Sequence, residues 1–267
     1  FDKALQGQVP GVVLSTASGQ PGASSQIQLR GTGSISAGSE PLIVIDGVVM
    51  YSGETTQAGS GSSILSSINP NDIESISVLK DASATSLYGS RGSNGVIMIT
   101  TKQGKKDKSA YTYSTTQGVG MLAMNNFELL TADQYKQLQT EGMKQAGMAQ
   151  EDIAAALQQQ TGNTNWFDEV YAPAWYQTYE FTSSGGNDKT TYFLSSQYKD
   201  EEGIVRGTDL KRFSTRINIQ NIANPVCTYG VKFNPSFTNR HVTDAPGVLA
   251  SPVTASFIAS PTQPVFN

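Results

Sequence analysis

Apolar and polar residues alternate along much of the second half of the chain, and this period of two predicts long β-strands. In Arg212–Gln220 the odd positions are apolar or β-branched and the even positions are polar. The same alternation recurs in Thr228–Thr238 and in Lys189–Lys199, where Phe193 is the one apolar residue on the polar face. Runs of this length are typical of transmembrane β-barrel strands, although a soluble antiparallel sheet with one wet face would produce the same pattern.

The first part of the chain has a different pattern, in which short β-type runs are separated by turn residues. The runs are Val12–Ser15, Ile27–Arg30, Leu42–Val49, Ile73–Leu79 and Gly95–Thr101. Asn69-Pro70-Asn71-Asp72 is a strong turn signal. Asp81 suits the N-cap and Gly89 the C-terminal stop of a helix of about two turns. Together these elements predict a small α/β domain.

A short basic segment, Gly104–Lys108, separates the two patterns. We therefore expect a domain over residues 1–108 and strands over residues 109–267, interrupted by a helical insertion near 131–162. Within that insertion Thr131-Ala-Asp-Gln134 forms a capping box, and Glu151–Gln160 is a second helical stretch.

The number of predicted strands is too small to close a membrane barrel. With Tyr111–Gly120 included, about five strands follow residue 108, whereas a membrane barrel closes with about eight or more. An open strand edge cannot face lipid. If the strands belong to a membrane barrel, we expect the chain to hold only the early strands of a larger one.

Composition narrows the class of partner. The 267 residues carry 18 Lys plus Arg against 22 Asp plus Glu, a net charge of −4, which is too mild to indicate nucleic acid as a partner. Only 15% of residues are charged and 26 are glycine, which favours β structure with many turns over a helical bundle. No apolar run approaches the roughly 18–20 residues of a membrane helix.

Candidate chemistry is sparse. The single cysteine, Cys227, and the single histidine, His241, leave no internal disulfide, no Cys-based zinc site and no multi-histidine catalysis, and we expect no metal or cofactor. Gly31-Thr-Gly33 and Gly89–Gly95 lack the strand before and the helix after that a phosphate-binding loop needs, so tight turns explain both. Asp46 could be catalytic, but its place in Ile-Asp-Gly-Val favours a turn residue. We do not expect the protein to be an enzyme.

Three basic residues fall on the polar alternate of the predicted strands: Arg212, Arg216 and Lys232. They could line a channel lumen; the other interpretation is the wet face of a sheet. Placing Ile217 toward lipid sets Arg216 and Asn218 inward, because strand side chains alternate strictly.

Motifs along nearly the whole chain resemble TonB-dependent outer-membrane transporters. The motifs similar to the plug domain of that family are Leu5–Gly7, Ser18–Gly22, Ile27–Gly31, Pro41–Val48, Asn69–Ala84 and Tyr88–Ile97. The combination of Ser18–Gly22 with Leu79–Ala84 is most like the SusC/RagA branch. The motifs similar to the first barrel strands of that branch are Asn165–Glu169, Ser184–Gly186 and Glu202–Val205.

The resemblance implies an α/β plug domain enclosed in a large antiparallel transmembrane β-barrel of about 22 strands, of which only the early strands are in this chain. It implies import of oligosaccharides or peptides across the outer membrane of a Gram-negative cell. The implied partners are TonB with its inner-membrane motor complex, a SusD-like surface lipoprotein and outer-membrane lipid.

The resemblance also suggests where cargo contacts the plug. Two segments rich in hydroxyl and amide groups follow plug strands, and their candidate cargo-binding residues are Ser34, Ser36, Ser39, Glu40, Tyr51, Glu54, Thr55 and Gln57. The other interpretation of both segments is disordered linkers. Two alternatives to active import stay open: a passive plugged porin or receptor, and a soluble β-rich glycan-binding module.

Overall fold

A computed structural model of the chain describes residues 12–16, 19–23, 25–29, 40–50, 68–80, 86–123, 128–243 and 251–265. The fold divides into two compact units, and each is described by itself. The first unit comprises Phe1–Gly118, Tyr176–Glu201 and Asp209–Arg240, and the second comprises Val119–Trp175, Glu202–Thr208 and His241–Asn267.

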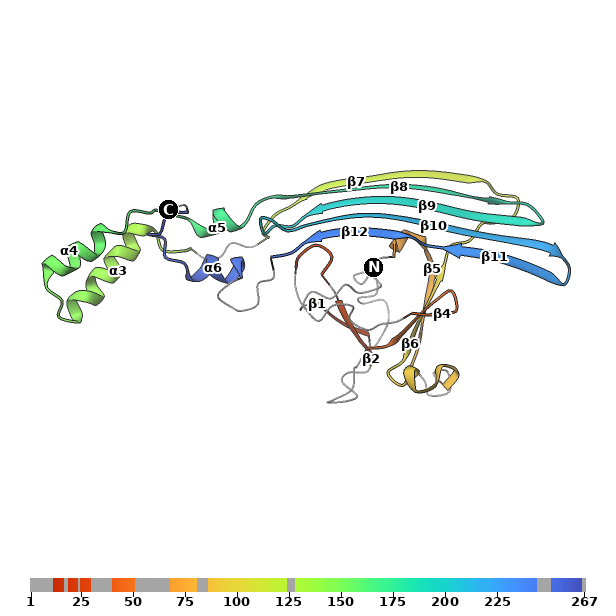
Figure 1. The fold of residues 1–267 in the computed structure, drawn as a ribbon, viewed down its shortest axis with the longest axis horizontal. Helices are drawn as coiled ribbons and strands as arrows, with labels where there is room; N and C mark the ends of the chain where they lie inside the picture. Colours follow the sequence, from red (N-terminus) through yellow and green to blue (C-terminus); the bar gives the residue numbers. More distant parts are fainter. Residues whose placement is uncertain are drawn as a thin grey trace. The chain divides into compact units, whose positions relative to one another are not determined.

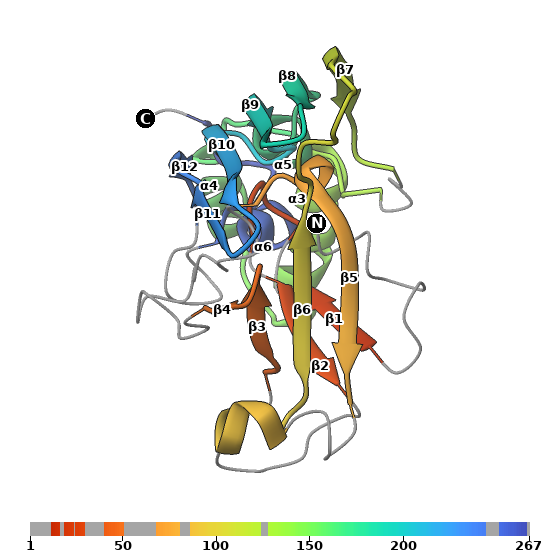
Figure 2. The same cartoon turned by 90° about the vertical axis from the view of Figure 1, so that its right-hand side faces the viewer.

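A mixed four-stranded sheet with the order β4-β3-β6-β5 forms the centre of the N-terminal domain, by which we mean residues up to 108 (Figure 2). β3 (Leu42–Ile45) runs parallel to β6 (Val96–Thr101), and β5 (Ile73–Leu79) runs antiparallel to β6. β4 (Val48–Val49) returns beside β3 through Asp46 and Gly47, whose φ angles are 51° and 86°. Two positive φ angles in a two-residue hairpin are what an Asp–Gly pair favours, so the interpretation of Asp46 as a turn residue is confirmed.

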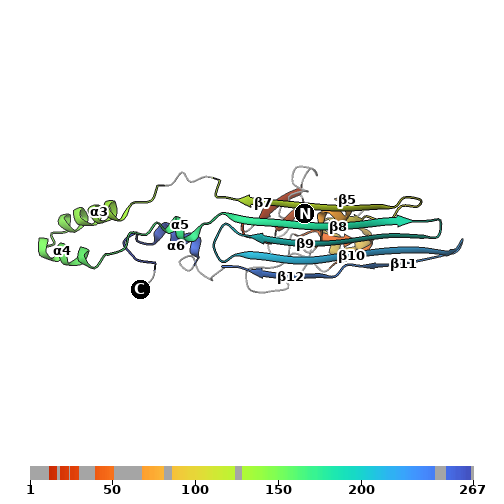
Figure 3. The ribbon, with the colours of Figure 1, turned by 90° about the horizontal axis from the view of Figure 1, so that it is seen from above.

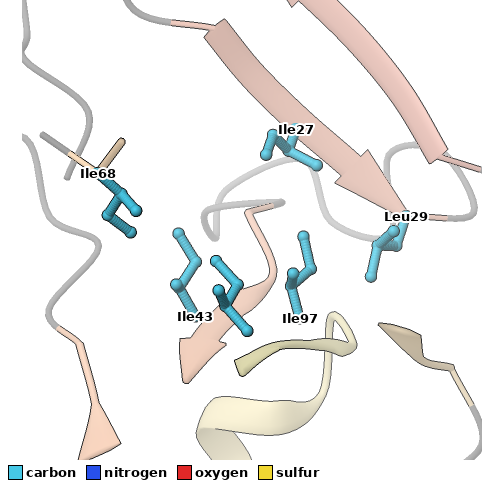
Figure 4. Packing of buried hydrophobic residues seen from close by; sticks show 6 residues of the cluster. Ile27, Leu29, Ile43, Ile68 and Ile97 are labelled. Atoms are coloured by element: carbon cyan, nitrogen blue, oxygen red, sulfur yellow. The ribbon is translucent and has the colours of Figure 1, made fainter. Parts of the chain in front are cut away.

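The apolar core of this domain lies between the sheet and a two-stranded antiparallel ribbon, β1 (Val12–Thr16) and β2 (Ser25–Leu29). The buried residues of this core are Ile27, Leu29, Ile43, Ile68, Ile97 and Ile99 (Figure 4). A second buried cluster consists of Leu42, Val44 and Val96. Each fully buried aliphatic side chain contributes about 1.5–3 kcal/mol, so this domain has a hydrophobic core of its own.

In this domain the predicted turn is present, whereas the predicted helix is displaced along the chain. The turn is confirmed as a short 3₁₀ segment, η2 (Pro70–Asp72), in which the Asn69 side chain accepts a hydrogen bond from Asn71 N at 3.0 Å. The helix expected over Asp81–Gly89 is displaced: the described part is 3₁₀, η3 (Ser86–Gly92), and Gly89 interrupts it at φ 63°. Asp81 lies outside the described residues.

A six-stranded sheet, here named the long sheet, follows the N-terminal domain. Its strands are β7 (Ala110–Gly120), β8 (Ala174–Gly186), β9 (Thr190–Glu202), β10 (Asp209–Asn224), β11 (Cys227–Phe233) and β12 (Ser236–His241). The order is β11-β10-β9-β8-β7, and β12 also pairs with β10 (Figure 1). β11 and β12 follow one another along β10 (Figure 3). Between them Pro235, which has no N–H, still accepts a hydrogen bond from Thr215 N at 3.0 Å.

The long sheet buries its polar face and exposes its apolar face. In β10 the side chains of Arg212, Ser214, Arg216 and Asn218 are buried, whereas Phe213 is 51% exposed. The face that the alternation assigned to the even residues of this strand is therefore confirmed. Phe193 is buried on the same face as Ser195 and Gln197, which accounts for the break in the alternation of β9.

The second unit contains four helices within the residues that the structure describes: α3 (Ala132–Gln145), α4 (Gln150–Gln158), α5 (Trp166–Val170) and α6 (Pro252–Ile258). The predicted capping box is confirmed, because Thr131 Oγ1 accepts from Gln134 N at 3.3 Å and Gln134 Oε1 accepts from Thr131 N at 3.0 Å. The ring of Phe167 in α5 contacts that of Phe257 in α6 edge-on, with centroids 5.1 Å apart. Over the described ranges no helix combines the length and the apolar character needed to cross a membrane.

Candidate functional site

A cluster of buried charges joins the N-terminal domain to the polar face of the long sheet. Arg216 of β10 lies between two carboxylates of the N-terminal domain: its Nη1 is 3.8 Å from Asp46 Oδ2 and its Nε is 3.4 Å from Asp72 Oδ2. The three side chains are 3%, 6% and 3% exposed, in the order Arg216, Asp46, Asp72. Charges buried to this degree stabilise one another, because a buried charge without a partner of opposite sign strongly destabilises the folded state.

Asp46 is bound both by its own domain, through Thr101, and by the long sheet, through Lys232. Its carboxylate accepts hydrogen bonds from Thr101 N at 2.9 Å and from Thr101 Oγ1 at 2.7 Å, and Lys232 Nζ lies 3.4 Å from Oδ1. Burial alone would raise the pKa of Asp46, but the Thr101 hydrogen bonds and the Lys232 charge outweigh it and lower the pKa below the ordinary 3.8. Asp46 is therefore an anion at neutral pH, fixed within its own domain and paired with the sheet.

Asp72 responds in the opposite direction. Burial raises the pKa of its carboxyl group above 3.8, and the nearby Glu180 adds to the rise, while Ser195 and Arg216 only partly oppose it. Lys102 N also donates to the Asp72 backbone carbonyl at 2.8 Å. Of the two buried carboxylates, Asp72 is the one whose pKa Arg216 helps to lower.

A second contact is made by the Asn69–Asp72 turn, which donates two side-chain amides to one carboxylate. Asn69 Nδ2 donates to Glu180 Oε1 at 3.2 Å and Asn71 Nδ2 donates to Glu180 Oε2 at 2.5 Å. Gln197 Nε2 donates to Asn69 Oδ1 at 2.9 Å, and Arg212 Nη2 donates to Gln197 Oε1 at 3.0 Å. A continuous hydrogen-bonded chain therefore runs from the turn across β8, β9 and β10.

A third contact is made where β6 ends. Asn218 Nδ2 donates to Thr101 Oγ1 at 3.1 Å and to Lys102 O at 2.8 Å. Because Thr101 also binds Asp46, the end of β6 and the β3–β4 turn are attached to the sheet together. Asn218 pairs across the strands with Lys232, so this contact adjoins the Asp46–Lys232 ion pair.

A cavity of about 340 Å³ opens beside the third contact. Gln103 and Gly104 line it from the N-terminal domain, and residues of β9, β10 and β11, including Thr191, Gln220 and Lys232, line it from the sheet. Among the described residues that line the cavity, Lys232 is the only charged one. The cavity therefore combines one cation with amide and hydroxyl groups.

The structure separates the basic residues that the sequence grouped. Arg212 is buried and donates to Gln197, and Arg216 is buried against Asp46 and Asp72 of the N-terminal domain, whereas the Lys232 side chain is 42% exposed and lines the cavity. Whether these residues line a transport lumen stays a prediction. Of the candidate cargo-binding residues only Glu40 is described, and it is exposed. Those outside the described residues are Ser34, Ser36, Ser39, Tyr51, Glu54, Thr55 and Gln57.

Several residues of the contact were not singled out from the sequence: Asn69, Asn71 and Glu180 as partners, and Gln197 and Asn218 as bridges. The available signal was a carboxylate and amides on the polar face of strands whose other face is apolar. The arrangement can hold two surfaces together and exchange each contact for water, but it contains no nucleophile–base pair. In the part of the chain that the structure describes, no three His, Cys, Asp or Glu side chains are grouped to hold a metal.

Comparison with protein families and with curated sequences finds similarity to TonB-dependent receptors in both cases. The family described as TonB-dependent Receptor Plug Domain matches residues 1–96. The TonB-dependent receptor SusC of Bacteroides thetaiotaomicron is 35% identical over 222 residues, covering 80% of this chain and 20% of that protein. The TonB-dependent receptor P26 of Formosa agariphila is 33% identical over 274 residues, covering 100% of this chain and 25% of that protein. The chain thus spans about a fifth to a quarter of the length of these curated relatives.

Solved structures agree. The structure of the RagAB peptide transporter superposes with a TM-score of 0.77 at 29% identity, covering 89% of this chain and 28% of that one. The siderophore receptor PirA from Acinetobacter baumannii shares the fold, with a TM-score of 0.55 at 17% identity, covering 94% of this chain and 32% of that one. The predicted fold class is confirmed, and the strands within the described ranges form open sheets without a closed barrel.

Proposed function

Residues 1–96 carry the plug domain of TonB-dependent receptors and the chain resembles receptors of the SusC/RagA type, and we propose on this premise that the protein imports oligomeric nutrients across the outer membrane with energy delivered through TonB. The N-terminal domain is then the plug, and the long sheet is part of the barrel wall. The cargo is an oligosaccharide or a peptide, and a SusD-like surface lipoprotein is the partner. The similarity to RagAB, a peptide transporter, supports a peptide as the cargo.

The observation that carries this proposal is the polar character of the contact between plug and wall. The plug keeps its apolar residues in its own core, whereas the Asn69–Asp72 turn, Asp46 and Thr101 meet the wall through hydrogen bonds and ion pairs. A hydrogen bond exchanged for water costs only about 0.5–1.5 kcal/mol net. The polar part of this contact can exchange with water, although the inner face of the wall also buries Phe193 and Leu210.

The wall side of the contact fits the same role. Glu180 of β8 binds the Asn69–Asp72 turn, Arg216 of β10 lies against both that turn and Asp46, and Asn218, two residues further along β10, binds the end of β6. Pulling on one plug segment would load the contacts of that segment first, where each hydrogen bond exchanges with water at about 0.5–1.5 kcal/mol while the buried Arg216 ion pairs resist more strongly. Gated passage needs this property, because the barrel must be closed at rest and open only when energy is supplied.

Import is tested by measuring uptake in cells that make the full-length receptor. We expect uptake of a fluorescent cargo to fall to the level of receptor-free cells when a protonophore dissipates the proton gradient, while cargo still binds at the cell surface. The matched control is a receptor lacking the plug, residues 1–108, whose leakage should be the same with and without the protonophore. If uptake by the intact receptor is the same with and without the protonophore, the passive plugged porin is favoured.

The partner and the cargo are tested by purification. A tagged receptor extracted from the outer membrane should carry with it a surface lipoprotein, and mass spectrometry of the small molecules released on denaturation should identify glycan or peptide. A receptor that purifies without any lipoprotein under mild detergent would contradict the proposed partnership.

A further inference from the structure

A cleft of about 770 Å³, here named the helical cleft, opens in the second unit. It is lined by the segment that leads into α3, by the start of α5 and by the end of α6, and α5 and α6 lie side by side (Figure 1). The lining residues with the most distinctive chemistry are Glu128, Gln134, Tyr135, Asn163, Trp166 and Phe257. The volume of the cleft falls within the roughly 300–1,000 Å³ of small-molecule sites.

The wall that carries Trp166 is held in place by hydrogen bonds. Residues 162–164 pair with residues 261–263 through two backbone hydrogen bonds of 2.9 Å. The indole Nε1 of Trp166 donates to Ser260 O at 2.9 Å, which restrains the ring. At Gly162 a methyl group would overlap backbone atoms of the opposite segment, so the two segments are in close contact. This wall is therefore formed before a ligand arrives, and binding does not have to order it.

Aromatic and aliphatic side chains of the lining are accessible to a ligand. Phe257 is 47% exposed and Ile258 is 58% exposed, while Tyr135 and Trp166 are half-buried. The faces of a pyranose ring carry C–H groups, and these pack well against the electron-rich face of an aromatic ring. The cleft therefore offers ring surfaces on which a sugar can stack.

The polar groups of the lining are mostly neutral. Gln134 uses its Oε1 in the capping box with Thr131, which leaves its Nε2 out of that contact, and Asn163 is exposed. An amide side chain both donates and accepts hydrogen bonds, as a sugar hydroxyl does. Among the described residues of the lining Glu128 is the only charged one, so the cleft disfavours a cargo with acidic groups.

A peptide matches this lining less well. Extended peptides are recognised by adding a strand to an exposed sheet edge, and none of the described residues that line the cleft belongs to a strand. A helical peptide docks into an apolar groove, whereas this lining mixes apolar residues with the amides of Gln134 and Asn163. The cleft therefore favours a glycan.

We propose that the helical cleft binds a neutral oligosaccharide. Its sugar rings stack on Trp166 and Tyr135, and its hydroxyls form hydrogen bonds with the amides of Gln134 and Asn163. The inference rests on the proposed import function and selects the oligosaccharide from the two cargo classes, against the peptide that the similarity to RagAB supports.

Titration calorimetry of the purified full-length receptor tests the class of ligand. The probes are four neutral hexasaccharides (malto-, laminari-, manno- and xylohexaose), and they are compared with capped neutral hexapeptides of glycine, serine and leucine. We expect at least one hexasaccharide to bind with a Kd of about 1 mM or lower and the peptides to bind about tenfold more weakly or worse. Binding of none of the hexasaccharides, or of a peptide as tightly as the best hexasaccharide, would overturn the proposal.

Variants test the place of binding. Trp166→Ala should weaken binding of the best hexasaccharide by about tenfold or more, because the stacking surface is lost. Asn163→Ala changes an exposed side chain, so the receptor should still fold, and binding should weaken by about threefold to tenfold through the loss of one hydrogen bond.

The matched control is Trp175→Ala, which removes the other tryptophan of the chain. Trp175 is 64% exposed and is not among the described residues of the lining, so the Kd should stay within about twofold. Equal affinity of the native, Trp166→Ala and Asn163→Ala receptors would show that the sugar binds elsewhere, and proton-driven uptake would be unaffected by that result. Uptake that is the same with and without a protonophore would instead refute the import function and leave these affinities unchanged.

Discussion

Among the residues that the structure describes, replacing Arg216 by methionine removes the only cation that forms an ion pair with Asp72 and one of the two that form ion pairs with Asp46. Breaking a buried ion pair from one side costs about 3–5 kcal/mol, because the other charge stays buried without compensation. Asp72 can instead take up a proton, which at pH 7 costs at most about 4 kcal/mol, the figure for the ordinary pKa of 3.8, because burial already raises the pKa of this group. We therefore expect Arg216→Met to weaken the attachment of the plug by about 3–4 kcal/mol.

Hydrogen exchange of the full-length receptor measures this loss where it occurs. Thr101 N–H donates to Asp46 and Lys102 N–H donates to Asp72 O, so the amides at the end of β6 report directly on the two carboxylate segments. Since about 1.4 kcal/mol corresponds to a factor of ten, protection of these amides should fall by roughly 100-fold or more.

The control and the refuting result come from two further variants. Lys211→Met removes a cation from the same strand, but Lys211 is 55% exposed and its ion pair with Asp200 measures 3.8 Å, so protection should stay within about threefold. Arg216→Met combined with Asp72→Asn should regain part of the protection, because the uncompensated charge is gone. Protection in Arg216→Met equal to that of Lys211→Met would show that the buried cluster does not hold the plug.

Three other changes have expected outcomes. Asp46→Asn should lower the thermal stability of the receptor at neutral pH, and because the folded pKa of Asp46 lies below 3.8 the difference from the native protein should vanish only as pH falls through that lowered pKa, which a pH series of melting temperatures checks. Gly104→Ala should reduce the yield of folded, heat-modifiable protein, because its methyl group would overlap backbone atoms of Tyr192, whereas Gly142→Ala in the open middle of α3 should not. Ile217→Arg should cost about 2–4 kcal/mol in membrane assembly if that face meets lipid, with Ile217→Val as the control in the same folding assay.

The strands and their faces could be predicted from the sequence because alternation is a local property. Arg212–Gln220 already showed which residues share a face, and the structure agrees. The predicted boundary between residues 108 and 109 is not tested by the fold, and it stays a prediction. Helices α5 and α6 escaped prediction because each is short and is held by contacts between them, including the edge-on rings of Phe167 and Phe257.

The partners of the plug contact could not be predicted because they are distant in the sequence. Asn69 and Glu180 are separated by 111 residues and Thr101 and Asn218 by 117. The pattern showed that Asn218 is on the inner face, yet nothing local to it indicates that β6 ends there. Such pairs follow only from how the plug is docked, which no single segment encodes.

The left-handed backbone at Asp46 restricts how this contact can change during evolution. At φ 51° a residue with a branched or bulky side chain is strained, whereas asparagine adopts this conformation with ease comparable to that of aspartate. Asparagine has nearly the shape of aspartate and is one base change away, but it lacks the charge that pairs with Arg216 and Lys232. One base change is therefore enough to replace a plug held by charge with a plug held by neutral hydrogen bonds, and the firmness of its attachment can change without rebuilding the turn.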